Sequence, residues 1–171
     1  MSLFAAFAPE VHGEIVPRVV VRRAVPADLS GILGIDAVRG PLKPGHPQRV
    51  LDQITDLATF TIVAQIDELV VGSSMARWWS GYENAPDGYY VSGVTVQPAW
   101  RRHRIGDGLL TELLTWIWQR EDSAWSVINA QNLPSLALHE RRGFREVARG
   151  RTLAGITFVG GAGVLLQAVR P

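Results

Sequence analysis

The spacing of apolar residues along the chain predicts a mixed α/β domain. Strand-like runs occur in VVVRRAV, FTIVAQIDELVVGSSMARWWS, YYVSGVTVQ, SAWSVINA, FREVARG and AGVLLQAVR,. Helical spacing occurs in PADLSGIL, HPQRVLDQITDLATF, IGDGLLTELLTWIWQRE and NLPSLALHERRG,. Asp67 and Glu68 interrupt the second strand-like run, which predicts a hairpin,. The order β-α-α-β-β-β-α-β-α-β-β predicts one sheet in which antiparallel meanders alternate with crossover helices.

Two of the predicted helices have a defined apolar face. The helix expected over residues 46–60 places Val50, Leu51, Ile54 and Leu57 at helical spacing,. The helix expected over residues 105–121 places Ile105, Leu109, Leu113, Trp116 and Ile117 close to one face,. Both helices are therefore expected to cover the sheet.

Length and charge limit the range of possible functions. The chain has 171 residues, of which 47% are hydrophobic, and this predicts one domain over residues 18–171 after a loosely attached arm at 1–17,. A net charge of +1 provides no overall field for nucleic acid or a membrane surface, so an anion site must be local,. The absence of cysteine excludes disulfides and thiolate sites and favours a cytoplasmic protein,. No apolar run approaches the length of a membrane span,.

Cations gather where a predicted strand gives way to a helix. Arg101, Arg102 and Arg104 precede Gly106 and Gly108 in this segment. The first backbone N–H groups of a helix lack partners, and glycine lets a ligand approach them, so the pattern indicates a phosphate site. A solvated turn tightened by glycine is the alternative. Neither G-x-x-x-x-G-K-[ST] nor G-x-G-x-x-G is present, which disfavours the common nucleotide-binding loops,.

Two sequence blocks resemble the GCN5-related N-acetyltransferase (GNAT) family. VTVQPAWRRHRIGDGLL resembles its strand, proline and [Q/R]-x-x-G-x-[G/A] helix start, and NLPSLALHERRGF resembles its N-x-x-A-x-x-L-Y-x-x-x-G-F block. His103 stands at the Gln/Arg position, and Arg104 replaces a frequent glycine. The resemblance spans roughly residues 18–169, and it implies a single-domain GNAT-like fold with a central, mostly antiparallel sheet flanked by helices.

This resemblance implies an acetyl-CoA-dependent N-acetyltransferase that acts by direct attack of an amine. Backbone amides at Val94 or Val96 would polarise the thioester carbonyl. Gly93 in the same strand is typical of a bulge, although a small residue on a crowded face would also fit. The implied contacts to the cofactor come from Val94, Val96, Arg101, Arg102, His103, Arg104, Ile105, Gly106, Asp107, Gly108, Asn132 and Ser135.

A proton donor for the leaving thiolate is less clearly indicated. His139 stands at the position of the family's frequent acid, a tyrosine, and either donates a proton or packs as an ordinary helix residue. Ser135, Tyr89 and Tyr90 are the alternative donors. No general base is evident, and water could relay the proton.

The acceptor is expected opposite the cofactor, between RGPLKPGHP and WWSGYENAPDGYY,. The aromatic residues of the second segment indicate a small or apolar amine, and a protein N-terminus is also open. A homodimer is possible. A non-catalytic acyl-CoA-binding sensor with the same fold is the main alternative. The GSSMA segment reads as strand interior, which disfavours a hydrolase, and the four histidines show no metal-ligand spacing,.

Overall fold

Seven strands form the central sheet of the computed structural model, which describes residues 18–171. The spatial order is β1-β2-β3-β4-β5-β9-β6, and every neighbouring pair is antiparallel except the parallel pair β4–β5. The strands are β1 (Val19–Arg23), β2 (Phe60–Ile66), β3 (Leu69–Trp79), β4 (Gly88–Val96), β5 (Ser123–Asn129), β6 (Arg145–Gly150) and β9 (Gly163–Val169). The predicted mixed, mostly antiparallel sheet is therefore confirmed.

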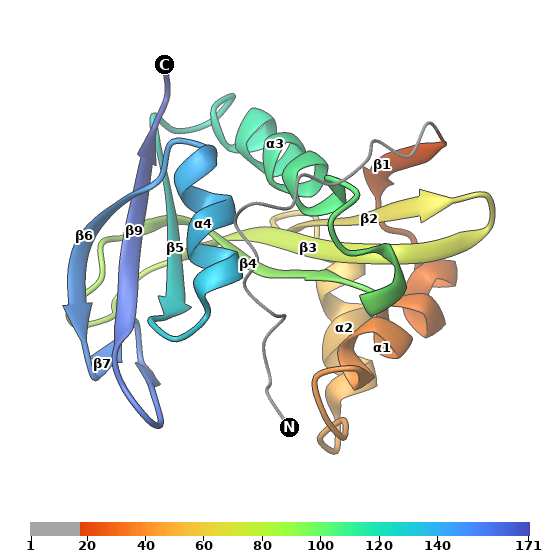
Figure 1. Cartoon of the computed structure of the whole chain (residues 1–171), viewed down its shortest axis with the longest axis horizontal. Helices are drawn as coiled ribbons and strands as arrows, with labels where there is room; N and C mark the ends of the chain where they lie inside the picture. The colour runs from red at the N-terminus through yellow and green to blue at the C-terminus, as the bar shows by residue number, and fades with distance from the viewer. Residues whose placement is uncertain (1–17) are drawn as a thin grey trace.

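Helices cover both faces of this sheet (Figure 1). The four helices are α1 (Leu29–Ala37), α2 (His46–Thr55), α3 (Ile105–Ile117) and α4 (Leu133–Arg141). Alternating residues of β2 separate the layers, because Ile62 packs in the cluster with α3 while Val63 packs in the cluster with α1 and α2,. The faces of the two amphipathic helices thus account for two separate apolar cores.

The predicted apolar faces are largely correct, but both helices are shorter than expected. Ile105, Leu109, Leu113 and Ile117 are buried, and Trp116 stacks on Phe60 with ring centroids 5.0 Å apart. Helix α2 ends at Thr55, because the Asp56 carboxylate accepts hydrogen bonds from the Ala58 amide and the Thr59 hydroxyl. Leu57 therefore lies beyond the helix and is 86% exposed.

A short hairpin between β6 and β9 was not predicted. It consists of β7 (Thr152–Leu153) and β8 (Ile156–Thr157), joined by Ala154 and Gly155 with φ of +49° and +73°. Two-residue strands are too short to give a periodic signal, although the positive φ of a two-residue turn explains the glycine. The predicted arm at residues 1–17 lies outside the described residues.

Strand β4 carries a bulge where it separates from β5. Ser73 pairs with Thr95 and Met75 with Ser92, so Gly93 and Val94 together oppose one residue of β3,. Gly93 has φ of +68°, and a Cβ there would meet no atom within 4 Å, so backbone conformation rather than crowding explains this glycine,. Only Tyr89 and Tyr90 pair with β5, and the two strands diverge beyond them.

Candidate functional site

The diverging strands border a cavity of about 1090 Å³ beside β4. Its walls come from Val91–Val96 of β4, Ser126–Asn129 of β5, the start of α3 and the inner face of α4. Ile156 to Val159, from the unpredicted hairpin and the residues after it, line it as well. The break in the sheet thus exposes β-strand backbone inside a cavity, which a continuous ladder would not do.

The start of α3 supplies backbone donors to this cavity. Ile105, Gly106 and Asp107 are its first three residues, whose amides precede the first intrahelical hydrogen bond, from Gly108 N–H to the Arg104 carbonyl at 3.0 Å,. Ile105, Gly106 and Asp107 all line the cavity. An anion here would meet unpaired N–H groups and the positive end of the helix dipole.

The turn that leads into α3 is held in a left-handed conformation without glycine. Arg102 has φ of +65° and Arg104 has φ of +57°. Such a conformation costs a non-glycine residue about 1–2 kcal/mol. Other interactions of the fold must offset this cost, and strained residues of this kind are often found at functional sites. The departure from the family pattern at Arg104 therefore keeps the glycine-like backbone and adds a guanidinium.

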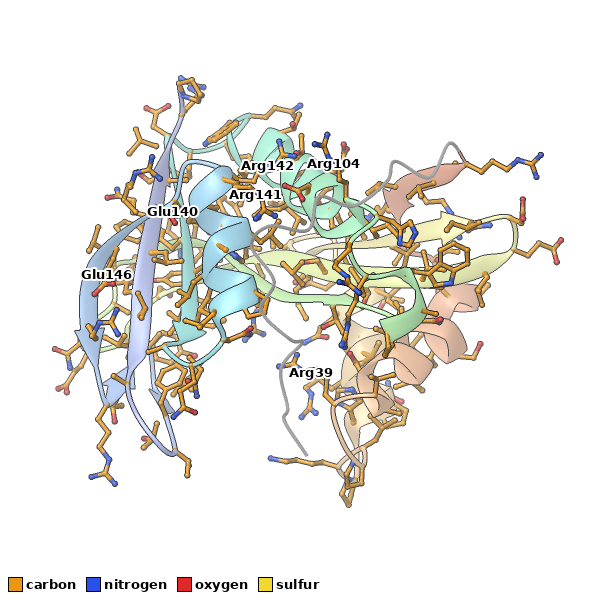
Figure 2. All side chains as sticks on the ribbon, in the orientation of Figure 1. Arg39, Arg104, Glu140, Arg141, Arg142 and Glu146 are labelled. Carbon is orange, nitrogen blue, oxygen red and sulfur yellow. The ribbon has the colours of Figure 1, made fainter. Side chains whose placement is uncertain are left out.

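Cations surround these backbone donors. Arg104, Arg141 and Arg142 gather near the start of α3 and the end of α4 (Figure 2). The Asp107 carboxylate accepts hydrogen bonds from Arg141 at 3.3 Å and Arg142 at 3.2 Å, which fixes α4 against α3. Arg101 and Arg102 also line the cavity. The excess of arginine over this one carboxylate makes this end of the cavity suited to a phosphate group.

Helix α4 carries Asn132, Ser135 and His139 along the cavity. Asn132 is the N-cap, and its side-chain oxygen accepts a hydrogen bond from the Ser135 amide at 3.3 Å,. The Nδ1 atom of His139 lies 2.8 Å from the Ser135 carbonyl oxygen and so carries the proton of the neutral ring,. Its Nε2 atom is buried and has no partner among residues 18–171.

Burial lowers the pKa of His139 to about 4, although the hydrogen bond to the Ser135 carbonyl opposes the shift,. The ring is thus neutral near pH 7, its single N–H is engaged, and Nε2 can only accept a hydrogen bond. This geometry offers no support for proton donation by His139.

The two candidate tyrosines lie away from the cavity. Tyr90 is fully buried, its hydroxyl donates to the Pro86 carbonyl at 2.8 Å, and burial raises its pKa to about 12. Tyr89 packs edge-on against Trp78 and Trp116. Neither is among the cavity-lining residues, so Ser135 is the one hydroxyl-bearing candidate donor from the sequence that lines the cavity.

Four apolar side chains, the polar Thr157 and one cation line the part of the cavity away from the arginines of α3 and α4, which we call the acceptor end. Trp79, Ile156, Phe158 and Val159 line it together with Arg39. Figure 2 shows Arg39 on the other side of β4 from Arg104, Arg141 and Arg142. The two predicted acceptor loops thus contribute one residue each, Arg39 from RGPLKPGHP and Trp79 from WWSGYENAPDGYY.

Most of the site residues expected from the sequence share this cavity. These are Val94, Val96, Arg101, Arg102, Arg104, Ile105, Gly106, Asp107, Asn132, Ser135 and His139. His103 and Gly108 do not line it: the His103 ring packs on Trp100, and a Cβ at Gly108 would meet Val21 of β1 at 3.6 Å. Ser126–Asn129 and the residues of the short hairpin were not identified from the sequence as site residues. For Ser126–Asn129 the sequence indicated only that they belong to a strand.

Two further properties of residues 18–171 bear on cofactors and location. No group of three or more histidine, aspartate or glutamate side chains in this range could hold a metal ion. No helix in the same range is long and apolar enough to span a membrane.

Comparison with known proteins agrees with this geometry. The sequence pattern of the Acetyltransferase (GNAT) family matches residues 36–144. No curated protein matches the sequence significantly. The fold is similar to that of ribosomal-protein-alanine N-acetyltransferase from Brucella melitensis, at 24% identity and a TM-score of 0.71, over 88% of this chain and 99% of that one.

Two further solved structures share the fold. Phosphinothricin acetyltransferase from Sinorhizobium meliloti, in complex with AcCoA, is 23% identical over 90% of this chain and 89% of that one, with a TM-score of 0.71. The putative acetyltransferase yncA from Salmonella typhimurium, with its cofactor acetyl-CoA, is 20% identical over 90% and 94%, with a TM-score of 0.73.

A split sheet beside an arginine-rich helix start can receive a phosphate-bearing ligand along the exposed strand,. The family match covers more than half of the chain. The chain therefore belongs to the GNAT acetyltransferase family, and it is an acetyl-CoA-dependent acyltransferase.

Proposed function

We propose that the protein transfers the acetyl group of acetyl-CoA to the primary amine of a small molecule. The observation that carries this proposal is the cavity beside β4, which is lined by backbone donors and arginines at the start of α3 and, on the other side of β4, by Arg39. Such a cavity lets a thioester and an amine enter from opposite sides and meet at the strand. Positioning of the two reactants can supply much of the rate enhancement.

The residues at the start of α3 would hold the pyrophosphate of acetyl-CoA. The amides of Ile105, Gly106 and Asp107 would donate to phosphate oxygens, and Arg101, Arg102 and Arg104 would add charge-assisted contacts. Val96, Asn132 and Ser135 line the path from there toward Val94, where the acyl arm would lie.

In the reaction, the neutral amine nitrogen forms a bond to the thioester carbonyl carbon, and the carbon–sulfur bond then breaks. The backbone N–H of Val94 would stabilise the oxyanion that forms on the carbonyl oxygen. The amine proton passes to water, and the departing thiolate takes a proton from water, either directly or through the Ser135 hydroxyl, which regains a proton from that water. Ser135 fits this role better than His139, because the only N–H of His139 already donates to a backbone carbonyl.

Incubation of the purified protein with acetyl-CoA and a panel of primary amines tests this proposal. The release of free thiol, with formation of the N-acetyl amine by mass spectrometry, should exceed the background of protein-free mixtures. Ser135→Ala should reduce kcat about ten- to a hundredfold if the hydroxyl protonates the thiolate, whereas Thr111→Ala, on the exposed face of α3, is the matched control. Absence of product from every amine would contradict the proposal.

A sensor that binds acetyl-CoA without turnover is the second candidate. The observation that favours it is the neutral, buried His139, which leaves the site without a strong acid. Isothermal titration with acetyl-CoA, combined with the thiol-release assay in the presence of amines, separates the two functions. A sensor would bind acetyl-CoA and release no thiol with any amine, whereas the transferase would do both.

A further inference from the structure

Among residues 18–171, the one charge at the acceptor end of the cavity is positive. In the part of the chain that the structure describes, Asp107 is the only aspartate or glutamate that lines the cavity, and its carboxylate is engaged by Arg141 and Arg142 at the other end. Within residues 18–171, Arg39 takes part in no ion pair. Its guanidinium is exposed and lines the cavity.

The backbone at Arg39 is anchored from both sides of its loop. The Arg39 amide donates to the Asp36 carbonyl at 3.0 Å, directly after the end of α1. Across the loop, the Asp36 carboxylate lies 2.8 Å from Nε2 of His46, and Arg49 lies 2.7 Å from Nδ1 of the same ring. These contacts tie the start of α2 to the end of α1, so Arg39 extends from a fixed point at the mouth of the cavity.

The charge of an incoming amine determines what this arrangement favours. A simple aliphatic amine is mostly an ammonium ion near neutral pH, because its pKa is close to that of lysine at about 10.4. An ammonium ion would meet a like charge at Arg39 and no available carboxylate, so its entry would be disfavoured. A carboxylate on the same molecule reverses the sign of this interaction and can accept two parallel hydrogen bonds from the guanidinium.

The rest of the acceptor end is suited to an apolar side chain. Trp79 stacks on Tyr90 with ring centroids 4.5 Å apart and 8° between planes, which holds the indole in place. Ile156 and Val159 are 39% and 89% exposed, so this part of the wall presents apolar surface that no other described residue covers. A bound apolar group would remove that surface from water.

We propose that the acceptor is an amino acid with an apolar side chain, whose carboxylate binds Arg39 while its amine faces Val94 and its side chain packs on Trp79, Ile156 and Val159. The inference rests on the proposed acetyl transfer and adds the class of its acceptor. Arg39 is then a specificity-determining residue, because it selects for the carboxylate and takes no part in bond making.

Matched amines test the inference with the full-length protein and acetyl-CoA. L-Phenylalanine, L-phenylalaninamide and 2-phenylethylamine share the ring and the amine but differ in the carboxylate. We expect kcat/KM for phenylalanine to exceed that for the amide, with most of the difference in KM. Arg39→Gln should lower this acid-to-amide ratio about 10- to 100-fold, as expected for loss of a charge-assisted pair. Arg39→Lys should lower it less, because it keeps the charge and loses the planar fork.

Arg18→Gln is the matched control. Arg18 is an exposed arginine directly before β1, its contact to Asp67 is 4.0 Å long, and it does not line the cavity. It should leave the ratio unchanged. A cation at Arg39 also stabilises the C-terminal end of α1 through the helix dipole. If that were its role, Arg39→Gln would lower thermal stability and leave the acid-to-amide ratio unchanged, which would overturn the inference.

The two proposals fail in distinguishable ways. Equal use of phenylalanine and its amide, or better use of a peptide amine than of any free amino acid, would overturn the carboxylate inference and leave acetyl transfer intact. Thiol release with none of the amines would overturn both.

Discussion

The low pKa of His139 predicts a specific loss of stability in acid. The pKa is about 4 in the folded protein against 6.5 in the unfolded chain, because the ring is 2% exposed and desolvation disfavours the imidazolium ion. Between these two values the unfolded chain binds a proton that the folded protein excludes, so the free energy of unfolding falls as the pH is lowered. Below the folded-state pKa, His139 makes no further difference.

The size of this effect follows from the shift. Each unit of pKa corresponds to about 1.4 kcal/mol, so the neutral His139 contributes about 3 kcal/mol in full to the free energy of unfolding. About 2 kcal/mol of this contribution is lost by a pH of about 5. His139→Phe removes the titrating group and keeps an aromatic ring that can contact Phe144, whose centroid lies 5.0 Å from that of His139. The variant should therefore become more stable relative to the wild type as the pH falls.

Urea unfolding of both proteins at several pH values between about 7 and 4 measures this difference. Carboxylates with lowered pKa, such as Asp28 beside Arg22, destabilise both proteins equally in acid and cancel in the comparison. His103→Phe is the control for loss of a histidine outside the cavity and should not reproduce the gain. Parallel stability curves for wild type and His139→Phe would refute the reasoning.

Two further predictions concern the two ends of the cavity. Gly106→Val should weaken acetyl-CoA binding at least about tenfold by calorimetry, because a Cβ there would lie 3.2 Å from Leu138 Cδ2 and beside the phosphate-binding amides,. Gly108→Ala, which faces Val21, should bind normally, and equal binding by a folded Gly106→Val would contradict the site. Trp79→Ala should raise the KM of the acceptor and leave acetyl-CoA affinity nearly unchanged, since Trp79 lines the cavity from the end of β3 and is not part of α3 or α4,. Tyr82→Ala should do so less, because Tyr82 packs against Trp79 at a centroid distance of 5.9 Å outside the cavity, and the reverse order would contradict this assignment.

Sequence periodicity captured the elements whose apolar faces are long. Helix α3 has buried residues at helical spacing and strands β2 to β4 are long runs with many buried positions, so their type and approximate limits were predictable,. The two-residue strands β7 and β8 have no such pattern, so the part of the acceptor wall at Ile156 was not predictable. Leu57 was assigned to a helix face because spacing alone cannot detect the Asp56 side chain that ends α2.

The site was predictable where backbone conformation follows from residue type. Gly93 and Gly106 indicated a bulge and a helix start, and both occur where expected. Side-chain direction was not predictable, because it depends on long-range packing. Tyr90 pairs with the parallel strand and turns its hydroxyl to Pro86, and His139 turns its only N–H to the backbone of its own helix.

The narrow junction between β4 and β5 has a mechanical consequence. Strands β1 to β4 form one half-sheet and β5, β9 and β6 form another, and their ladder is limited to Tyr89 with Ala124 and Tyr90 with Trp125. A ligand bound between β4 and β5, where the two strands have diverged, would contact both half-sheets and connect them. Acetyl-CoA would then raise the melting temperature of the whole molecule, in proportion to the logarithm of its concentration above the dissociation constant.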